Sequence, residues 1–99
     1  MTIDKTQENG KLTLVINGKL DTTTAPQFKE VLIPSIDEAR QIELDLTKLS
    51  YISSAGLRVL LLGQKTATAN GVSMTLCGVS EEIKEILEMT GFVNILKIV

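Results

Sequence analysis

The hydrophobic pattern changes its period between residues 42 and 62. Apolar and polar residues alternate over 42–47, which predicts a strand with one buried face. From residue 57 leucines recur at helical spacing, and they predict a helix that begins at or just after Ser53-Ser54 and ends at Asn70-Gly71. Either serine is suited to cap this helix, because a hydroxyl oxygen can accept a backbone N–H bond. The positive end of the helix dipole at the same place also suits a phosphate group.

Other segments at both ends of the chain are predicted to be extended. An Asn-Gly turn separates two antiparallel strands over 2–6 and 11–16. Asn17-Gly18 would ordinarily mark another turn, and no further strand pattern follows it before the next helix. Alternation returns over 72–76 and predicts a strand. The apolar tail 94–99 is expected to form a last edge strand or an extension across the core.

A first helix is predicted to start at Thr24, in a stretch rich in N-cap residues. Pro26 lies in its first turn, and Gln27 is placed to form a capping box with Thr24. The expected inner face consists of Phe28, Val31, Leu32 and Ile36. A proline inside a helix removes one hydrogen bond and clashes with the preceding turn. Pro34 therefore predicts a kink or an end near Ile33.

The last helix is predicted to be capped by Ser80 and to stop at Gly91. Glu81 and Glu82 in its first turn complement the helix dipole. The expected apolar stripe consists of Ile83, Ile86, Leu87 and Met89.

The alternation of strands and helices after the first hairpin predicts right-handed crossovers between parallel strands. The hairpin itself adds antiparallel pairing, so the sheet should be mixed. We expect a single α/β domain over 1–99, a two-layer sandwich of a small mixed sheet with about four or five strands and about three main helices.

The loops that follow the strands, at 17–24, 47–54 and 77–80, should then lie at one edge of the sheet, where α/β proteins tend to place their sites. Asp21 and Ser54 are expected to be neighbours there. Asp21 is equally suited to helix capping, and Asp45 is interpreted as a solvated or loop-bracing carboxylate.

The composition of the chain excludes most kinds of catalytic site. The chain has no histidine and one cysteine, which excludes disulfides within the chain, most zinc sites and catalysis by an imidazole base. Neither a P-loop nor a dinucleotide-binding glycine motif is present. Cys77 is better explained as a small buried apolar group than as a reactive thiol, since no cationic residue flanks it. We therefore expect no enzyme activity, no catalytic residue, no cofactor and no metal.

The net charge of −2 gives no reason to expect nucleic acid or an anionic membrane as partner. No apolar run approaches the ~18 residues of a membrane span. The first ten residues contain neither a basic n-region nor an apolar h-region. These features predict a cytoplasmic protein, expected as a monomer or weak dimer.

Three segments of the chain resemble a known family. They are GKLDTTTAP at 18–26, LDLTKLSYISSAGLRVL at 44–60 and SEEIKEILEMTGF at 80–92. Together they resemble the STAS domains of bacterial anti-sigma factor antagonists over nearly the whole chain. The resemblance implies the sheet-and-helix sandwich and a regulator of sigma-factor-dependent transcription. Such a protein binds an anti-sigma factor with serine kinase activity, is phosphorylated by it at the start of the central helix, and is restored by a PP2C-type phosphatase.

The family motif identifies a candidate phosphate acceptor. Family members commonly read D-S-S-G-L or D-S-T-G-L, with the acceptor hydroxyl directly before the glycine. Here Ala55 precedes Gly56, so that position offers no hydroxyl. In D-S-A-G-L variants the serine before the alanine is the acceptor, and Ser54 matches it. Ser53 stands where the aspartate usually does and is the reserve acceptor.

The resemblance also implies a partner-binding surface around the acceptor. Asp21 matches an acidic residue that the family carries in the loop before the first helix. Arg58 is placed to meet a phosphate or a carboxylate of the partner. The predicted partner-binding residues are Asp21, Thr22, Thr23, Ser53, Ser54, Gly56 and Arg58.

An alternative function follows from the missing hydroxyl before Gly56. The chain would then be a STAS adaptor that is not phosphorylated and acts in a larger signalling or transport complex.

Overall fold

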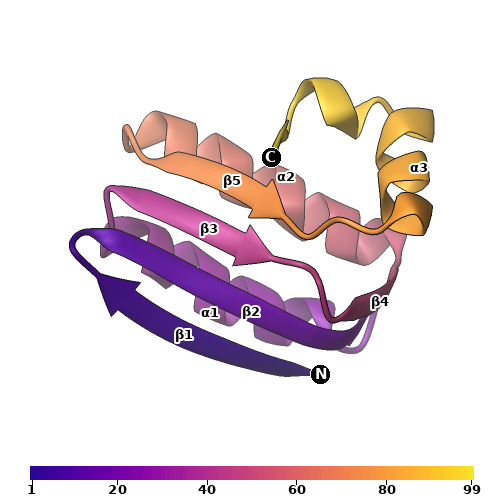
Figure 1. The fold of residues 1–99 in the computed structure, drawn as a ribbon, viewed down its shortest axis with the longest axis horizontal. Coiled ribbons are helices and arrows are strands. Elements are labelled where there is room, and N and C mark those ends of the chain that lie inside the picture. The colour runs from indigo at the N-terminus through magenta and orange to yellow at the C-terminus, as the bar shows by residue number, and fades with distance from the viewer.

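A computed structural model describes residues 1–99, as a mixed sheet covered mainly on one face by helices (Figure 1). The elements in chain order are β1 (Thr2–Glu8), β2 (Lys11–Leu20), α1 (Ala25–Asp37), β3 (Gln41–Asp45), β4 (Leu49–Ile52), α2 (Ser54–Ala69), β5 (Ser73–Cys77), α3 (Glu81–Met89), the 3-10 helix η1 (Phe92–Asn94) and β6 (Lys97–Ile98). The predicted α/β class, mixed sheet and three main helices are confirmed, with six strands where four or five were expected.

The strands lie in the order β1-β2-β3-β5-β6. β1 pairs with β2 in antiparallel fashion across the turn at Asn9 and Gly10, both of which have positive φ. β3, β5 and β6 continue the sheet in parallel pairs. The two crossovers β2-α1-β3 and β4-α2-β5 place α1 and α2 behind the sheet, as Figure 1 shows. β6 confirms the expectation of a last edge strand in the tail.

β2 is longer than the predicted strand over 11–16. Its last residues, 17–20, belong to the segment that was expected to be a loop over 17–24. β2 continues to Leu20 through Gly18, whose φ is 113°. The first half of β2 pairs with β3, and its last residues pair in parallel with β4. β4 was not predicted and lies inside the expected 47–54 loop. Its two buried residues are three apart rather than two, so its sequence shows no strand alternation.

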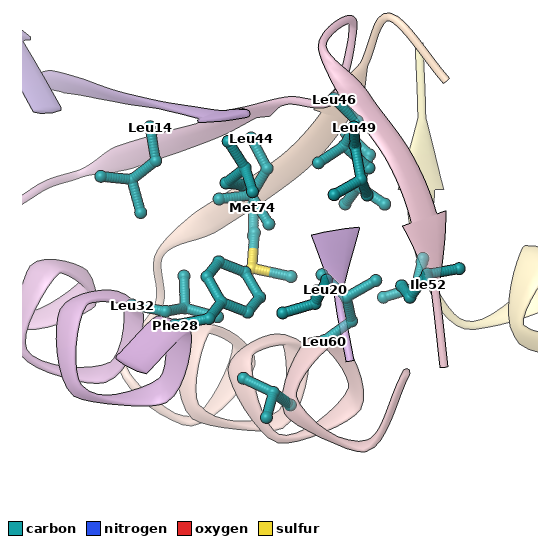
Figure 2. Close-up of a cluster of buried hydrophobic side chains, with 14 of the residues drawn as sticks. Leu14, Leu20, Phe28, Leu32, Leu44, Leu46, Leu49, Ile52, Leu60 and Met74 are labelled. Atoms are coloured by element: carbon teal, nitrogen blue, oxygen red, sulfur yellow. The ribbon is translucent and has the colours of Figure 1, made fainter. Parts of the chain in front are cut away.

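The core lies between the sheet and the layer formed by α1 and α2. It is one cluster of 22 buried apolar residues, drawn from β2 to β5, the three α-helices and the segments beside them, with Ile3 of β1 and Ile98 of β6 partly buried against it. Figure 2 shows Phe28 of α1 against Met74 of β5, with Leu32 beside it. Burial of each large apolar side chain stabilises the fold by about 1.5–3 kcal/mol, so this cluster is the dominant favourable contribution. None of the helices is both long and apolar enough to cross a bilayer.

The N-terminal end of α1 differs from prediction in one respect. Thr24 is the N-cap residue and Pro26 lies in the first turn, as expected. The predicted capping box with Gln27 is wrong, because the Thr24 side chain makes no cap bond. Its hydroxyl instead donates to the carbonyl of Lys19 at 2.8 Å.

Pro34 was expected to cause either a kink or an end near Ile33. An end is wrong, since the helix continues through Pro34 to Asp37, and the kink stays a prediction. Pro34 leaves the carbonyl of Glu30 without its helical N–H partner. Both residues are exposed, so water can bond to that carbonyl at little cost. On the inner face, Phe28, Leu32 and Ile36 are buried and Val31 is half-buried.

α3 begins and ends as predicted. Ser80 caps it, its hydroxyl oxygen accepting from Ile83 N–H at 3.2 Å, and Gly91 follows it with a φ of 78°. Ile83 and Leu87 are buried, and Ile86 is half-buried. The assignment of Met89 to the apolar stripe is wrong, because its side chain is 80% exposed. Two residues beyond Leu87, it points about 200° around the helix from the buried face.

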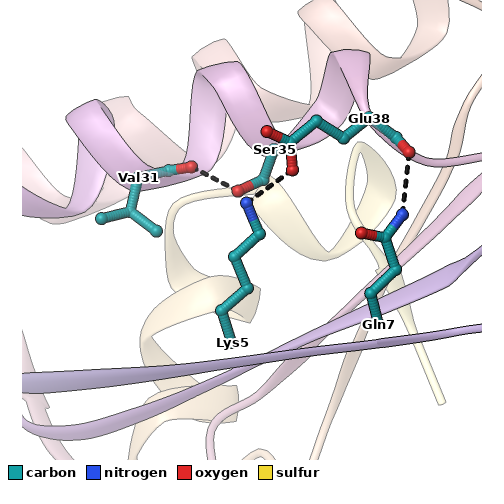
Figure 3. A network of polar contacts seen from close by, with 5 residues as sticks. All are labelled: Lys5, Gln7, Val31, Ser35 and Glu38. Atoms are coloured by element: carbon teal, nitrogen blue, oxygen red, sulfur yellow. Dashed lines mark hydrogen bonds and ion pairs between the residues drawn. The ribbon is translucent and has the colours of Figure 1, made fainter.

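Side chains of β1 hold the edge strand to the end of α1 (Figure 3). Lys5 Nζ lies 2.6 Å from Glu38 Oε2, and Gln7 Nε2 donates to the Glu38 carbonyl at 3.0 Å. Because the ion pair is exposed, it contributes at most about 1 kcal/mol. The antiparallel pairing with β2 places β1 in the sheet, and these contacts connect it in addition to the end of α1.

α1 and α2 approach closely at Gly63, which is buried. A Cβ added at this position would lie 2.6 Å from Leu32 Cδ2. We predict that Gly63→Ala lowers the free energy of unfolding, because a steric cost of about 1–3 kcal/mol exceeds a helix-propensity gain of about 1 kcal/mol.

In a Leu32→Ala background the clash is gone, so the same Gly63→Ala change should become stabilising by about 1 kcal/mol. Urea unfolding of the four proteins measures both effects. An identical effect of Gly63→Ala in the two backgrounds would contradict this account of the helix contact.

Candidate functional site

The carboxyl ends of the parallel strands meet at one edge of the sheet, as predicted. Ser53 N–H donates to the carbonyl of Leu20 at 2.9 Å, which joins the end of β2 to the start of α2. Leu46 N–H donates to the carbonyl of Cys77 at 2.9 Å, which joins the ends of β3 and β5. The three predicted loop regions therefore form one continuous edge. Asp21 and Ser54 each follow directly after a partner of the Leu20–Ser53 hydrogen bond.

The two serines at the start of α2 have different environments. Ser53 is the N-cap residue with extended backbone, and its hydroxyl oxygen accepts from Gly56 N–H at 3.4 Å. Ser54 is the first helical residue and is exposed, and its hydroxyl makes no hydrogen bond within the chain. Because Ser53 acts as the cap, the hydroxyl of Ser54 is the free one.

Gly56 lets α2 approach the ends of β2 and β4. A Cβ added at Gly56 would lie 2.7 Å from Leu20 Cγ and 3.0 Å from Ile52 Cγ1. Gly56 is itself buried, so its contribution to the predicted partner-binding surface is positional. It brings the first turn of α2 against the strand ends that carry the loops.

The Asp21 loop is held by threonine side chains. Asp21 Oδ1 accepts from the Thr23 hydroxyl at 2.7 Å, from Thr23 N–H at 3.0 Å and from Thr24 N–H at 3.1 Å. The Thr23 hydroxyl, followed by the Thr24 N–H, lowers the pKa of the Asp21 carboxyl. Asp21 is therefore ionised and fixed at neutral pH. Thr22 is exposed and makes no side-chain hydrogen bond.

Asp45 forms the same kind of turn at the end of β3. Its Oδ1 accepts from the Thr47 hydroxyl at 2.6 Å and from Thr47 N–H at 3.0 Å. The Thr47 hydroxyl and then its N–H lower the pKa of the Asp45 carboxyl. This confirms the interpretation of Asp45 as a loop-bracing carboxylate. The Asp-x-Thr spacing occurs at 21–23 and at 45–47, and this repetition was a sequence signal for both turns.

A Cβ at Gly78, which has a φ of 66°, would collide with the Thr47 hydroxyl. The β5–α3 connection therefore packs against the Asp45 turn, and the edge is braced on this side as well.

Arg58 and Cys77 are two further charged or nucleophilic side chains near this edge. Arg58, one turn along α2 from Ser54, is exposed and makes no ion pair. Burial, followed by the negative charges of Glu43 and Asp45, raises the pKa of the Cys77 thiol, which keeps it protonated and unreactive. No group of three or more metal-ligating side chains is present. What this edge does offer is the exposed hydroxyl of Ser54.

The lowered pKa values of Asp21 and Asp45 predict an acid-sensitive fold. A carboxyl whose pKa is depressed on folding contributes stability above its unfolded pKa, here near the ordinary value of 3.8, and loses it as pH falls through the folded value. We expect the free energy of unfolding to decline below about pH 4. Asp45→Asn should decline less steeply than wild type in urea unfolding between pH 7 and pH 3.

Asp4→Asn is the matched control, since the side chain of Asp4 is exposed and makes no hydrogen bond. It should keep the wild-type slope with pH. Equal slopes for Asp45→Asn and wild type would contradict the role given to the Asp45 turn.

Comparison with known proteins identifies the fold family. The model of the STAS domain family matches residues 2–99. BtrV of Bordetella bronchiseptica is 35% identical over 96 residues, which cover 96% of this chain and 81% of that protein. The anti-sigma-B factor antagonist of Listeria monocytogenes is 30% identical over 95 residues, which cover 95% of this chain and 83% of that protein.

Solved structures of similar fold include the anti-sigma factor antagonist SpoIIAA in two states. The unphosphorylated form has a TM-score of 0.78 at 14% identity, covering 99% of this chain and 87% of that one. The phosphorylated form, from Bacillus, has a TM-score of 0.77 at 15% identity, covering 99% and 91%. The chain belongs to the STAS domain family, and its relatives there are anti-sigma factor antagonists of bacteria.

Proposed function

We propose that this protein is an anti-sigma factor antagonist whose binding to a kinase-type anti-sigma factor is switched by phosphorylation of Ser54. The observation that carries the proposal is the exposed Ser54 hydroxyl, which has no hydrogen bond and stands at the first position of α2. The Listeria relative is named an anti-sigma-B factor antagonist, and SpoIIAA, of the same fold, has been solved with and without its phosphate.

The start of α2 suits a phosphate physically. The first N–H groups of a helix have no intrahelical partners, and the helix dipole favours negative charge there. Ser53 would continue to cap the helix, so modification of Ser54 does not require the first turn to rearrange. Ser53 remains the reserve acceptor, but its hydroxyl is half-buried and engaged with Gly56 N–H.

The switch would act through charge at the docking edge. Phosphorylation adds about −1.5 to −2 charges at pH 7. Asp21 is held ionised in the neighbouring loop, so the phosphate would add to negative charge already fixed at the surface. Repulsion and the cost of desolvating the phosphate would then oppose docking of a partner on this edge.

The same proposal includes the predicted partner proteins and the cytoplasmic location. Asp21, Thr22, Thr23, Ser54 and Arg58 would contact the anti-sigma factor, with Ser53 and Gly56 holding them in place. A PP2C-type phosphatase would remove the phosphate and restore binding. The protein itself would act without catalysis, in the cytoplasm where sigma factors operate.

A STAS adaptor without phosphorylation is the second candidate. The observation that favours it is Ala55, which leaves no hydroxyl at the position before Gly56. The two candidates differ in whether the chain accepts phosphate at all.

We predict phosphate incorporation at Ser54 when the protein is incubated with ATP and the anti-sigma factor kinase encoded in the same genome. Peptide mass spectrometry locates the phosphate. Ser54→Ala should abolish incorporation with little effect on stability, because Ser54 is not the cap. The matched control Ser53→Ala should keep incorporation while losing about 1 kcal/mol of stability.

Incorporation at Ser53 in the Ser54→Ala protein would reassign the acceptor. No incorporation into wild type would favour the adaptor.

We further predict that Ser54→Asp weakens binding of the anti-sigma factor by about 5–150-fold, corresponding to a coupling of about 1–3 kcal/mol. Isothermal titration calorimetry measures the affinity, and circular dichroism should show an unchanged fold. Thr68→Asp adds the same charge at the exposed far end of α2 and serves as control. Wild-type affinity of Ser54→Asp would refute the charge switch.

A further inference from the structure

β4 contains a bulge that turns its tyrosine outward. Gly18 pairs with Leu49 and Lys19 pairs with Tyr51, so Ser50 is an extra residue in β4. In a regular strand without a bulge, alternation would place Tyr51 on the same face as Leu49, two residues before it, which is buried. The extra residue reverses the phase, and Ile52 returns to the core at 3% exposure. Bulges commonly re-aim a side chain beside a functional site.

Hydrogen bonds fix the bulge in place. Gly18 N–H donates to the Lys48 carbonyl at 3.0 Å, and the Ser50 hydroxyl donates to the Gly18 carbonyl at 3.1 Å. The positive φ of Gly18 lies at the same step of β2. The outward direction of Tyr51 is therefore built into the backbone of two strands.

Tyr51 has the properties of a residue that anchors a binding partner. It is 49% exposed, and its hydroxyl makes no hydrogen bond within the chain. Exposed tyrosines supply large contact area at low entropic cost and are enriched among residues that dominate binding energy. Lys19, its register partner, is exposed on the same face and makes no ion pair.

The position of Tyr51 connects it to the proposed docking edge. Tyr51 is two residues before Ser53, and the buried Ile52 lies between them. The other large exposed apolar side chains lie on other elements: Leu62 on α2, Met89 on α3, and Ile95 and Val99 in the C-terminal segment. Only Tyr51 adjoins the start of α2 along the chain.

We propose that Lys19, Ser50 and Tyr51, here called the tyrosine patch, bind the anti-sigma factor at an apolar pocket with an acidic rim. The tyrosine ring enters the pocket, and the rim pairs with the free ammonium group of Lys19. This inference rests on the proposed function and extends its docking surface from the loops and α2 onto β4.

The test compares Tyr51→Ala with Ile95→Ala in calorimetric titrations of the anti-sigma factor. Both side chains are 49% exposed, but Ile95 lies beside Gly71 and Val72 at the opposite end of β5. Tyr51→Ala should weaken binding at least about tenfold, whereas Ile95→Ala should leave it unchanged. Tyr51→Phe should retain most of the affinity, and Lys19→Glu should lower it most at low salt.

The outcomes separate the two proposals. Failure of wild type to bind the anti-sigma factor would overturn the proposed function and, with it, the occupant assigned to the patch. Binding by wild type that Tyr51→Ala and Ile95→Ala leave equally strong would overturn the tyrosine patch alone.

A second measurement uses the wild-type protein, so it does not depend on the folding of a variant. Tyr51 is the only tyrosine in the chain, so its O-acetylation by N-acetylimidazole is read at one site by mass spectrometry. The anti-sigma factor should slow this acetylation severalfold, and equal rates in the free and bound protein would overturn the patch.

Discussion

The last two carbonyls of β2 hold together the edge at which we propose that the partner docks. The Lys19 carbonyl accepts the Thr24 hydroxyl at 2.8 Å, and the Leu20 carbonyl accepts Ser53 N–H at 2.9 Å. One strand end is thus bonded to the residues that precede two different helices. The absence of a side chain at Gly56 permits the second of these contacts. The end of β2 therefore determines the positions of both the Asp21 loop and Ser54.

This construction favours a switch that changes charge rather than shape. Threonine side chains and N–H groups brace the carboxylates of Asp21 and Asp45, and Ser53 already satisfies an N–H of the first turn of α2. Little conformational freedom is left at the edge for a phosphate to order. A partner would therefore meet the same backbone before and after modification and would respond to the altered electrostatic surface.

Much of this arrangement was predictable from local sequence patterns. Each correct prediction rests on a feature of one element. The alternation over 42–47 and the leucine spacing of α2 reflect the burial of one face, and the cap at Ser80 is a hydrogen bond within its own helix. The meeting of Asp21 and Ser54 at one edge followed from the parallel order of the strands. The roles of the two serines did not follow, because capping depends on backbone angles that differ between adjacent residues. The structure provides these, with Ser53 extended and Ser54 helical.

The failures have a common cause in contacts between distant segments. β4 is stabilised by pairing with the end of β2, and its bulge erases the alternation by which a strand is recognised. The Thr24 hydroxyl bonds to Lys19 instead of capping its own helix. The helix passes through Pro34 because the unpaired carbonyl faces water and because the core holds Leu32 and Ile36 on either side. In each case a tertiary contact outweighed a local preference.

The outermost strands of the main path of the sheet, β1 and β6, have a consequence for how the protein associates. β1 exposes a charged, mostly polar strand tied back to α1 by Lys5, and β6 offers only two residues. Neither edge is a good template for adding a strand from another molecule. Strand addition tends to produce extended assemblies, whereas contacts at the end of a sheet remain discrete. β1 and β6 thus disfavour open-ended association through strand addition, which would hinder any component that must change partners repeatedly.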